Sequence, residues 1–298
     1  MATGETETVL AGVDGSPQSI DAMALAMALA PHFGARARAA YVHPLGESDR
    51  AVSDPLYRNA LDELASFVRA HMREPGAPLD ARPLSVIEER FPARGLADEA
   101  RRRGAPLIAV GASHRSQLGR ALFGGTAERL MTGSPCPVAV APKGYANQVA
   151  RLRTIGCAFD GSAEARAALA WARTLAGAAG CDLRILTVHK PQLAALPAYH
   201  GLPTVATDEA AQRELRRRLI VAIREVEADG VSVEGVMLEG RPASLLQEQS
   251  ADLDLLVAGS RGYGPSRAVL VGSVSRALVR NPSCPVVVMP RDSEDGES

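Results

Sequence analysis

The sequence lacks several features that would assign it to a membrane, secreted or metal-stabilised class. No apolar run approaches the ~20 residues that a transmembrane helix needs. Acidic residues occupy the N-terminus where a signal peptide would be basic, so we expect a cytoplasmic protein. The four cysteines form no CxxC pair and have no zinc spacing, which indicates reduced, structural thiols.

Strong charge and familiar catalytic motifs are also missing. The formal net charge of −1 provides no general attraction to nucleic acid or to anionic membranes, so we expect neither as a partner. There is no Walker GxxxxGK(S/T) motif, and no His-Glu pair, Ser-His-Asp set or metal-ligand cluster occurs at a plausible spacing. These absences argue against a P-loop ATPase, a triad hydrolase and a metalloenzyme.

The sequence does contain an internal repeat. Asp14-Gly15-Ser16 recurs as Asp160-Gly161-Ser162, and residues 107–142 match residues 255–290 in the same order. The period is far longer than that of solenoid repeats. We therefore predict two domains, a first half at 1–146 and a second half at 147–291, followed by a disordered tail at 292–298.

Short apolar runs alternate with longer helical patterns in each half. In the second half we expect strands at 154–159, 183–189, 231–238, 254–259 and 285–289, and helices at about 163–178, 205–228, 242–250 and 267–280. In the first half we expect strands near 8–13, 37–43, 79–87, 106–110 and 137–141. This alternation predicts an α/β fold of two tandem Rossmann-like domains, each a five-stranded, parallel, doubly wound sheet in the order 3-2-1-4-5.

The predicted helix at 205–228 is amphipathic. Leu215, Leu219, Ala222, Ile223 and Val226 are spaced for one apolar face. The remaining positions carry a charge run, which we interpret as a solvated face and not as a binding patch; it consists of Arg213, Glu214, Arg216, Arg217 and Arg218.

A loop rich in glycine, serine and arginine follows the fourth strand of the second half, in the stretch VAGSRGYGPSRAVLVGSVSRAL at 257–278. Glycines let a backbone turn at positive φ and approach phosphates closely, and a helix start offers unpaired N–H groups. We expect Gly259 and Gly262 to shape this loop. Gly272, Ser273 and Ser275 would open the last helix, and Arg261 would reach phosphate.

Strand order brings this loop close to Asp160. In a 3-2-1-4-5 sheet the winding reverses between strands 1 and 4, and ligands bind beyond the carboxyl ends of the strands at that point. Asp160 ends strand 1 and Gly259 ends strand 4, so we expect them to meet. Asp160 suits a ribose hydroxyl or an adenine edge. The alternative is a turn-forming aspartate, because Asp-Gly-Ser is also good turn chemistry.

These motifs resemble those of the universal stress protein family. Gly259-x-x-Gly262, nine residues, then Gly272-Ser273 is the G-2x-G-9x-G-(S/T) pattern of its ATP-binding members, and the resemblance covers both halves. It implies an adenine nucleotide alpha hydrolase-like fold that binds ATP, with Mg²⁺ accompanying the triphosphate. The residues that it implies for the second-half site are Ala158, Asp160, Val188, Ala258, Gly259, Arg261, Gly262, Gly272, Ser273, Val274 and Ser275.

The first half departs from this pattern. His114 stands where the second glycine is expected, and Gly124-Gly125-Thr126 replaces Gly-Ser-Val. An imidazole there either crowds the phosphate loop or contacts phosphate. The resemblance implies a first-half site made of Asp14, Val42, Gly111, His114, Gly124, Gly125 and Thr126.

The function implied by the resemblance is non-enzymatic: an ATP-binding module in a stress response or in signalling. Two alternatives stay open, a slow ATPase and a nucleotide-free scaffold for protein contacts. The last strand of each half is apolar and bounded by prolines, in CPVAVAP and CPVVVMP. Such an edge invites pairing, so we expect either pseudo-twofold pairing of the halves or a homodimer.

Overall fold

The computed structural model describes residues 7–43, 55–72, 84–112, 125–149, 151–191, 204–260 and 272–290. Contacts divide the chain into two compact units. Unit 1 comprises Met1–Arg151 together with Val279–Ser298, and unit 2 comprises Leu152–Leu278. The last strand of the second sequence repeat is therefore counted with unit 1.

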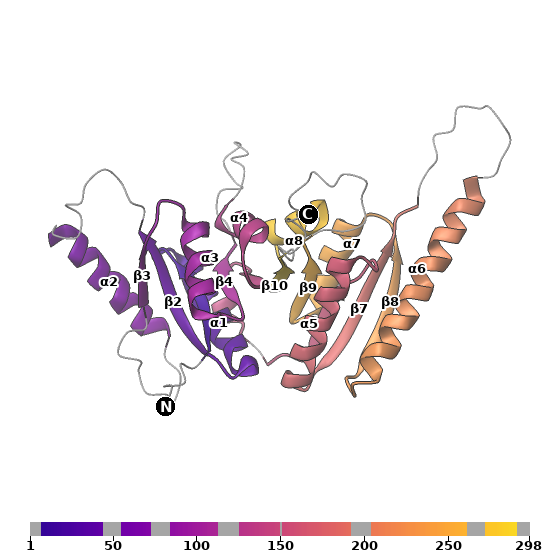
Figure 1. Cartoon of the computed structure of the whole chain (residues 1–298), viewed down its shortest axis with the longest axis horizontal. Helices are drawn as coiled ribbons and strands as arrows, with labels where there is room; N and C mark the ends of the chain where they lie inside the picture. The colour runs from indigo at the N-terminus through magenta and orange to yellow at the C-terminus, as the bar shows by residue number, and fades with distance from the viewer. Residues whose placement is uncertain are drawn as a thin grey trace. The chain divides into compact units, whose positions relative to one another are not determined.

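Unit 1 alternates strands and helices as the apolar pattern predicts (Figure 1). Its strands from the first half are β1 (Thr8–Val13), β2 (Arg36–His43), β3 (Leu84–Glu88), β4 (Ile108–Gly111) and β5 (Val138–Ala141). Its helices are α1 (Pro17–Leu29), α2 (Pro55–His71), α3 (Pro92–Arg103) and α4 (Thr126–Gly133), with short 3-10 turns η1 (Ala30–Phe33) and η4 (Tyr145–Asn147).

Unit 2 repeats the alternation. Its strands are β6 (Thr154–Ala158), β7 (Asp182–His189), β8 (Val233–Glu239) and β9 (Leu255–Gly259). Its helices are α5 (Ala163–Ala179), α6 (Thr204–Glu227) and α7 (Pro242–Gln249), with the 3-10 turn η5 (Ser250–Asp252). Helix α8 (Ser273–Arg280) and strand β10 (Val286–Met289) complete the described elements.

The predicted strand order is confirmed. Within unit 1 the parallel strands run β3-β2-β1-β4-β5, and within unit 2 they run β8-β7-β6-β9. The chain moves one way from β6 through β7 to β8 and then returns to the other side of β6 with β9. Crossovers of one hand that travel in opposite directions lie on opposite faces of a sheet, so each sheet is covered on both faces.

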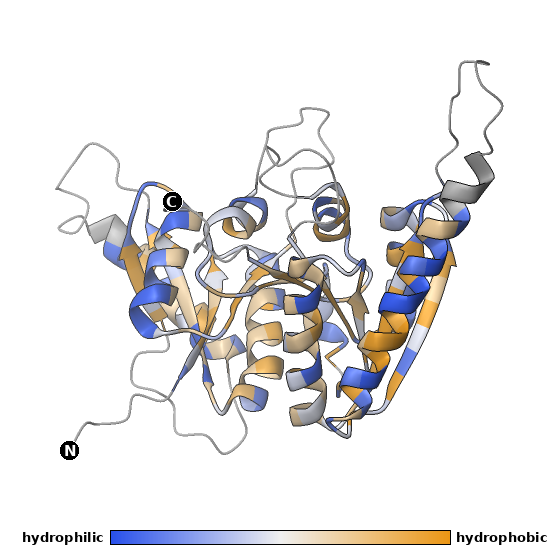
Figure 2. Ribbon diagram, turned by 45° about the vertical axis from the view of Figure 1, so that its right-hand side comes forward, coloured by the Kyte–Doolittle hydropathy of each residue, from blue (hydrophilic) through white to orange (hydrophobic). Residues whose placement is uncertain are grey.

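Strands that are covered on both faces are apolar along their whole length. Every residue of β5 and of β9 is buried. Figure 2 shows hydrophobic colour along the strands, while α6 carries both hydrophobic and hydrophilic residues. Leu219, Ala222 and Val226 on that helix are buried, which confirms the predicted apolar face of α6.

Strand β10 pairs antiparallel with β5 inside unit 1. Val287 lies opposite Ala139 in this pairing, so β10 covers the edge of β5.

Cys136 precedes β5 and Cys284 precedes β10, and antiparallel register puts these two buried thiols at opposite ends of the two-stranded ribbon. Burial raises the pKa of the Cys136 thiol to about 11, against a weaker opposing effect of the Ser134 hydroxyl, so this thiol is protonated and inert at neutral pH.

Helices of the described part of the chain do not reach the combination of length and hydropathy that crossing a bilayer requires. The long helix α6, with 24 residues, is amphipathic instead.

Candidate functional site

The second-half site begins with a tight turn at the carboxyl end of β6. Gly161 has a φ of +79°, the left-handed region that glycine adopts without strain. The Ser162 backbone N–H donates to Asp160 Oδ1 over 2.9 Å, and the Ser162 hydroxyl accepts from the Ala165 N–H over 3.1 Å. One oxygen of Asp160 therefore forms the turn, and Ser162 caps α5.

Strand β9 ends beside this turn. Strands β6 and β9 are parallel neighbours, with Cys157 opposite Val257, so the carboxyl ends of both strands share one edge. Gly259 is required here by packing. A Cβ on Gly259 would lie 2.9 Å from the backbone carbon of Glu164, so only glycine lets the first turn of α5 approach the strand. Gly259 thus positions helix and strand, while most of the loop that we expected it to shape lies outside the described residues.

Two contacts hold the start of α8 against the end of β9. The Gly272 N–H donates to the Ser260 carbonyl over 2.7 Å, and the Ser275 hydroxyl donates to the Gly259 carbonyl over 2.6 Å. Ser275 is buried and its hydroxyl makes this structural contact. The first turn of α8 therefore opens at the same edge of the sheet as Asp160.

A buried polar atom at this edge is unsatisfied. Ser260 is 1% exposed, and its hydroxyl has no hydrogen-bond partner among the residues that the structure describes. The Nε of Arg276, in the first turns of α8, is in the same condition within that part of the chain. Buried polar groups are normally paired, so each such group needs an explanation. Ser260 did not feature among the predicted site residues, although it follows Gly259 directly in the motif.

The structure brings together most of the predicted second-half residues. Ala158 and Val188 are half-buried at the carboxyl ends of β6 and β7, and Ala258 is buried in β9. In the opening of α8, Gly272 and Val274 are half-buried and Ser273 is exposed. Arg261 and Gly262 lie outside the described residues.

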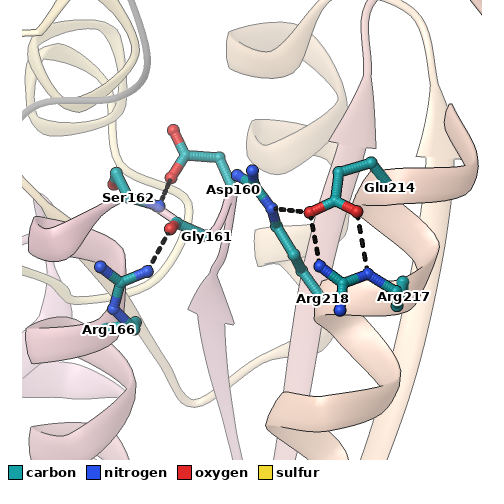
Figure 3. A network of polar contacts seen from close by, with 7 residues as sticks. All are labelled: Asp160, Gly161, Ser162, Arg166, Glu214, Arg217 and Arg218. Carbon is teal, nitrogen blue, oxygen red and sulfur yellow. Dashed lines mark hydrogen bonds and ion pairs between the residues drawn. The ribbon is translucent and has the colours of Figure 1, made fainter. Parts of the chain in front are cut away.

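Two arginines that we did not predict surround the same turn (Figure 3). Arg166 Nη1 donates to the Gly161 carbonyl over 2.5 Å. Arg218 extends from α6 over the turn, and a Cβ on Gly161 would lie 2.6 Å from its Cδ. Only 34% of the Arg218 side chain is exposed, so it departs from the solvated face that we expected for the charge run of α6. The sequence signal was present only as an arginine near the apolar stripe of the helix.

The first-half site repeats the backbone with other side chains. Gly15 has a φ of +80°, and the Ser16 N–H donates to Asp14 Oδ1 over 3.0 Å. The Ser19 hydroxyl also donates to Asp14 Oδ1, over 2.9 Å. Burial acts to raise the pKa of Asp14, but the hydrogen bonds from Ser16 and Ser19 outweigh it, and the pKa lies below its ordinary value.

Other predicted residues of the first half have similar positions to their second-half counterparts. A Cβ on Gly111 would lie 2.6 Å from the backbone oxygen of Gln18, so this glycine too is required by packing against a helix. Val42 is buried near the end of β2, and Gly125 precedes Thr126, the first residue of α4. His114 and Gly124 lie outside the described residues.

Other possible sites in the described chain are weaker. No group of three or more His, Cys, Asp or Glu residues there could hold a metal ion. A cavity of about 140 Å³ lies at the opposite, amino end of the unit 2 strands, where it is lined by residues such as Thr154, Asp182 and Val233. This cavity is remote from the turn at Asp160 and from the glycine motif, so we do not assign the site to it.

Comparison with known proteins gives consistent matches to one family. The model of the "Universal stress protein family" matches residues 5–142 and, separately, residues 151–290. A universal stress protein of Thermus aquaticus is 35% identical over 140 residues, which cover 46% of this chain and 98% of the relative. A universal stress protein of Mycobacterium tuberculosis is 27% identical over 201 residues, 66% of this chain and 68% of the relative.

The fold is also that of a solved structure. The crystal structure of a universal stress protein from Archaeoglobus fulgidus matches with a TM-score of 0.63 and 20% sequence identity. The match covers 96% of this chain and 97% of that one, so the likeness extends over both repeats.

Proposed function

The chain belongs to the universal stress protein family, and from this premise we propose that its second half binds an adenine nucleotide, ATP by preference. The bound nucleotide would make the protein a nucleotide-dependent module of a stress response or of signalling. The observation that carries the proposal is the buried hydroxyl of Ser260, which has no hydrogen-bond partner in the described part of the chain and lies at the edge where β6 and β9 end. A ligand with several acceptor oxygens would satisfy this donor.

The surroundings of Ser260 support a nucleotide more than a small anion. Asp160 lies at the end of the neighbouring strand, and a carboxylate accepts hydrogen bonds from ribose hydroxyls or from an amino group. The start of α8 adds backbone N–H groups and the positive end of a helix dipole, which favour phosphate. Mg²⁺ would be held chiefly by phosphate oxygens and water.

The first half is a second, less complete candidate. It keeps Asp14, the packed glycine Gly111 and the helix start at Thr126. We propose that it binds nucleotide more weakly than the second half, since His114 stands at the position of Gly262 and Gly124-Gly125-Thr126 replaces Gly-Ser-Val.

A direct test is to denature the purified protein, identify any released nucleotide by mass spectrometry, and count it per chain. About one equivalent per chain supports a second-half site alone, and two equivalents support both halves. If none is released and calorimetry with Mg-ATP detects no heat, the nucleotide proposal is wrong and the scaffold alternative takes its place.

The variant Ser260→Ala tests whether the Ser260 hydroxyl binds the nucleotide. Removing an unpaired buried hydroxyl should leave the stability unchanged or slightly raised, while a lost hydrogen bond to ligand should weaken Mg-ATP binding about tenfold. Ser250→Ala is the matched control, because Ser250 is equally buried but donates to the Gln247 carbonyl over 2.7 Å. We expect Ser250→Ala to lower the melting temperature without changing ATP affinity. If Ser260→Ala instead lowers the melting temperature and leaves ATP affinity unchanged, Ser260 is a structural residue.

ATP turnover and the oligomeric state can be measured on the same protein. Turnover of ATP that Ser260→Ala abolishes would favour a slow ATPase over a binding module. The predicted homodimer is tested by sedimentation velocity with and without ATP.

A further inference from the structure

Arg218 occupies the space above the Asp160-Gly161-Ser162 turn. If Gly161 carried a Cβ, that atom would lie 3.2 Å from Arg218 Nη1 and 3.5 Å from Nε. The guanidinium itself therefore rests against the turn, as the close view shows (Figure 3). A cation is thus placed at the carboxyl end of β6, beside the edge where β9 ends.

A neighbouring carboxylate fixes the direction of this side chain. Arg218 Nε donates to Glu214 Oε1 over 2.9 Å, and Arg217 binds the same carboxylate through Nε and Nη2 over 2.9 and 3.0 Å. The Arg217 side chain is 71% exposed, whereas that of Arg218 is 34% exposed. Hydrogen bonds from Arg217 and Arg218 lower the pKa of Glu214 to about 2, so the carboxylate is ionised at any physiological pH.

The charge around the turn differs between the two halves. In the second half, Arg166 and Arg218 contact Gly161 and so flank Asp160. In the first half, the offset of the repeat puts Ile20 in the place of Arg166, and among the described residues Leu64 is the side chain that comes within 4 Å of a Cβ placed on Gly15, at 3.8 Å. Within the described residues, the acidic turn of the first half therefore has apolar neighbours where that of the second half has guanidinium groups.

We propose that Arg218 is a specificity-determining residue of the second-half site, whose guanidinium attracts the anionic part of the nucleotide. This inference rests on the proposed function. A guanidinium binds phosphate oxygens through charge-assisted hydrogen bonds, and one next to Asp160 offsets the repulsion that this carboxylate exerts on an anion. Arg218 would then favour ATP over the neutral nucleoside in the second half, and the first half, with Leu64, would lack this preference.

The experiment compares Arg218→Leu, Arg218→Lys and Arg217→Leu in the full-length protein, with calorimetric titration of Mg-ATP and of adenosine. Arg217→Leu is the matched control, because it removes the adjacent arginine that shares Glu214 but is turned to solvent. We expect Arg218→Leu to weaken ATP binding about tenfold and to leave adenosine binding within about twofold. Arg218→Lys should recover part of the loss, and the ATP difference should shrink as salt is raised.

Three results would overturn the inference. Equal ATP affinity in the wild type and Arg218→Leu would remove Arg218 from the site while leaving the proposed function intact. Equal losses of affinity for ATP and for adenosine in Arg218→Leu would mean that Arg218 acts through its shape and not through its charge. If the wild-type protein binds neither ligand, the proposed function and this inference both fail. Melting temperatures of the variants identify any loss that is due to misfolding.

Discussion

The Asp-Gly-Ser turns of the two halves have almost the same backbone and different side-chain surroundings. Gly15 and Gly161 have φ values of +80° and +79°, and the backbone N–H of each following serine donates to the aspartate. Asp14 also accepts from Ser19, whereas the repeat places Ala165 at that position in the second half.

This difference separates the architectural part of the motif from the part that can recognise a ligand. What both halves keep is what the fold needs: a left-handed glycine in the turn and a second glycine, Gly111 or Gly259, where the first helix crosses the end of the fourth strand. What differs is the set of side chains around the aspartate. The two halves therefore share the backbone of the turn, while the charges of the described side chains around the aspartate differ.

The largest effect that we expect concerns the packed glycines. Gly111→Ala should lower the free energy of unfolding by about 3 kcal/mol and Gly259→Ala by about 2 kcal/mol, because each new methyl meets helix backbone that cannot rotate away. The Gly111 position is the tighter one, with a Cβ at 2.6 Å from the Gln18 oxygen against 2.9 Å from the Glu164 carbon for Gly259. Chemical denaturation measures both.

Gly133→Ala is the control for this pair, because no described residue outside its own helix backbone and its chain neighbours comes within 4 Å of a Cβ at that position. We expect it to change stability by less than about 0.5 kcal/mol. If Gly111→Ala were equally mild, the close approach of α1 to β4 would not explain the glycine.

The second prediction uses the turn glycines. Gly15→Ala should cost about 1 kcal/mol, the strain of placing an L-residue at positive φ. Gly161→Ala should cost about 2 kcal/mol, because its methyl must also displace Arg218. A double-mutant cycle measures the difference: in an Arg218→Ala background the cost of Gly161→Ala should fall to about 1 kcal/mol. An unchanged cost would mean that Arg218 does not rest on the turn.

The third prediction concerns helix caps. The Ser162 hydroxyl accepts from the Ala165 N–H, whereas the Ser16 side chain makes no capping hydrogen bond to α1. Ser162→Ala should therefore cost about 1 kcal/mol in thermal or urea unfolding, and Ser16→Ala only a few tenths. Similar costs at the two positions would show that the caps, unlike the side chains around the aspartates, have not diverged.

Much of the fold followed from apolar runs and turn residues, since these act over a few neighbouring positions. The strand order, and with it the placing of Asp160 and Gly259 at the carboxyl ends of neighbouring strands, was predictable because parallel crossovers have one hand. Residues 84–87 of the strand predicted at 79–87 lie in β3, the rest of it lies outside the described residues, and helix α6 was placed within one residue at each end.

Contacts between remote segments were not predictable in the same way. Arg218 belongs by its spacing to a charged helix face, and the sequence does not show that its side chain reaches Gly161 from a helix that packs on β7 and β8. Gly259 was predicted to end the fourth strand and to shape the loop after it, but the sequence does not show that α5 packs against the strand there. The Ser260 hydroxyl is buried and has no partner among the described residues, a condition of the folded chain that has no local signature in the sequence.

The smallest effect concerns the protonation of Asp14. The hydrogen bonds from Ser16 and Ser19 favour its carboxylate, so its folded-state pKa lies below the value in the unfolded chain. The resulting stabilisation is complete above the unfolded pKa and fades as the pH falls through the folded one. Ser19→Ala removes one donor, so the pKa of Asp14 should rise toward its ordinary value when followed by NMR titration. Ile20→Ala, at the next position along α1, should leave it unchanged. If Ser19→Ala does not move this pKa, the Ser19 hydroxyl does not distinguish the first-half aspartate from Asp160 in solution.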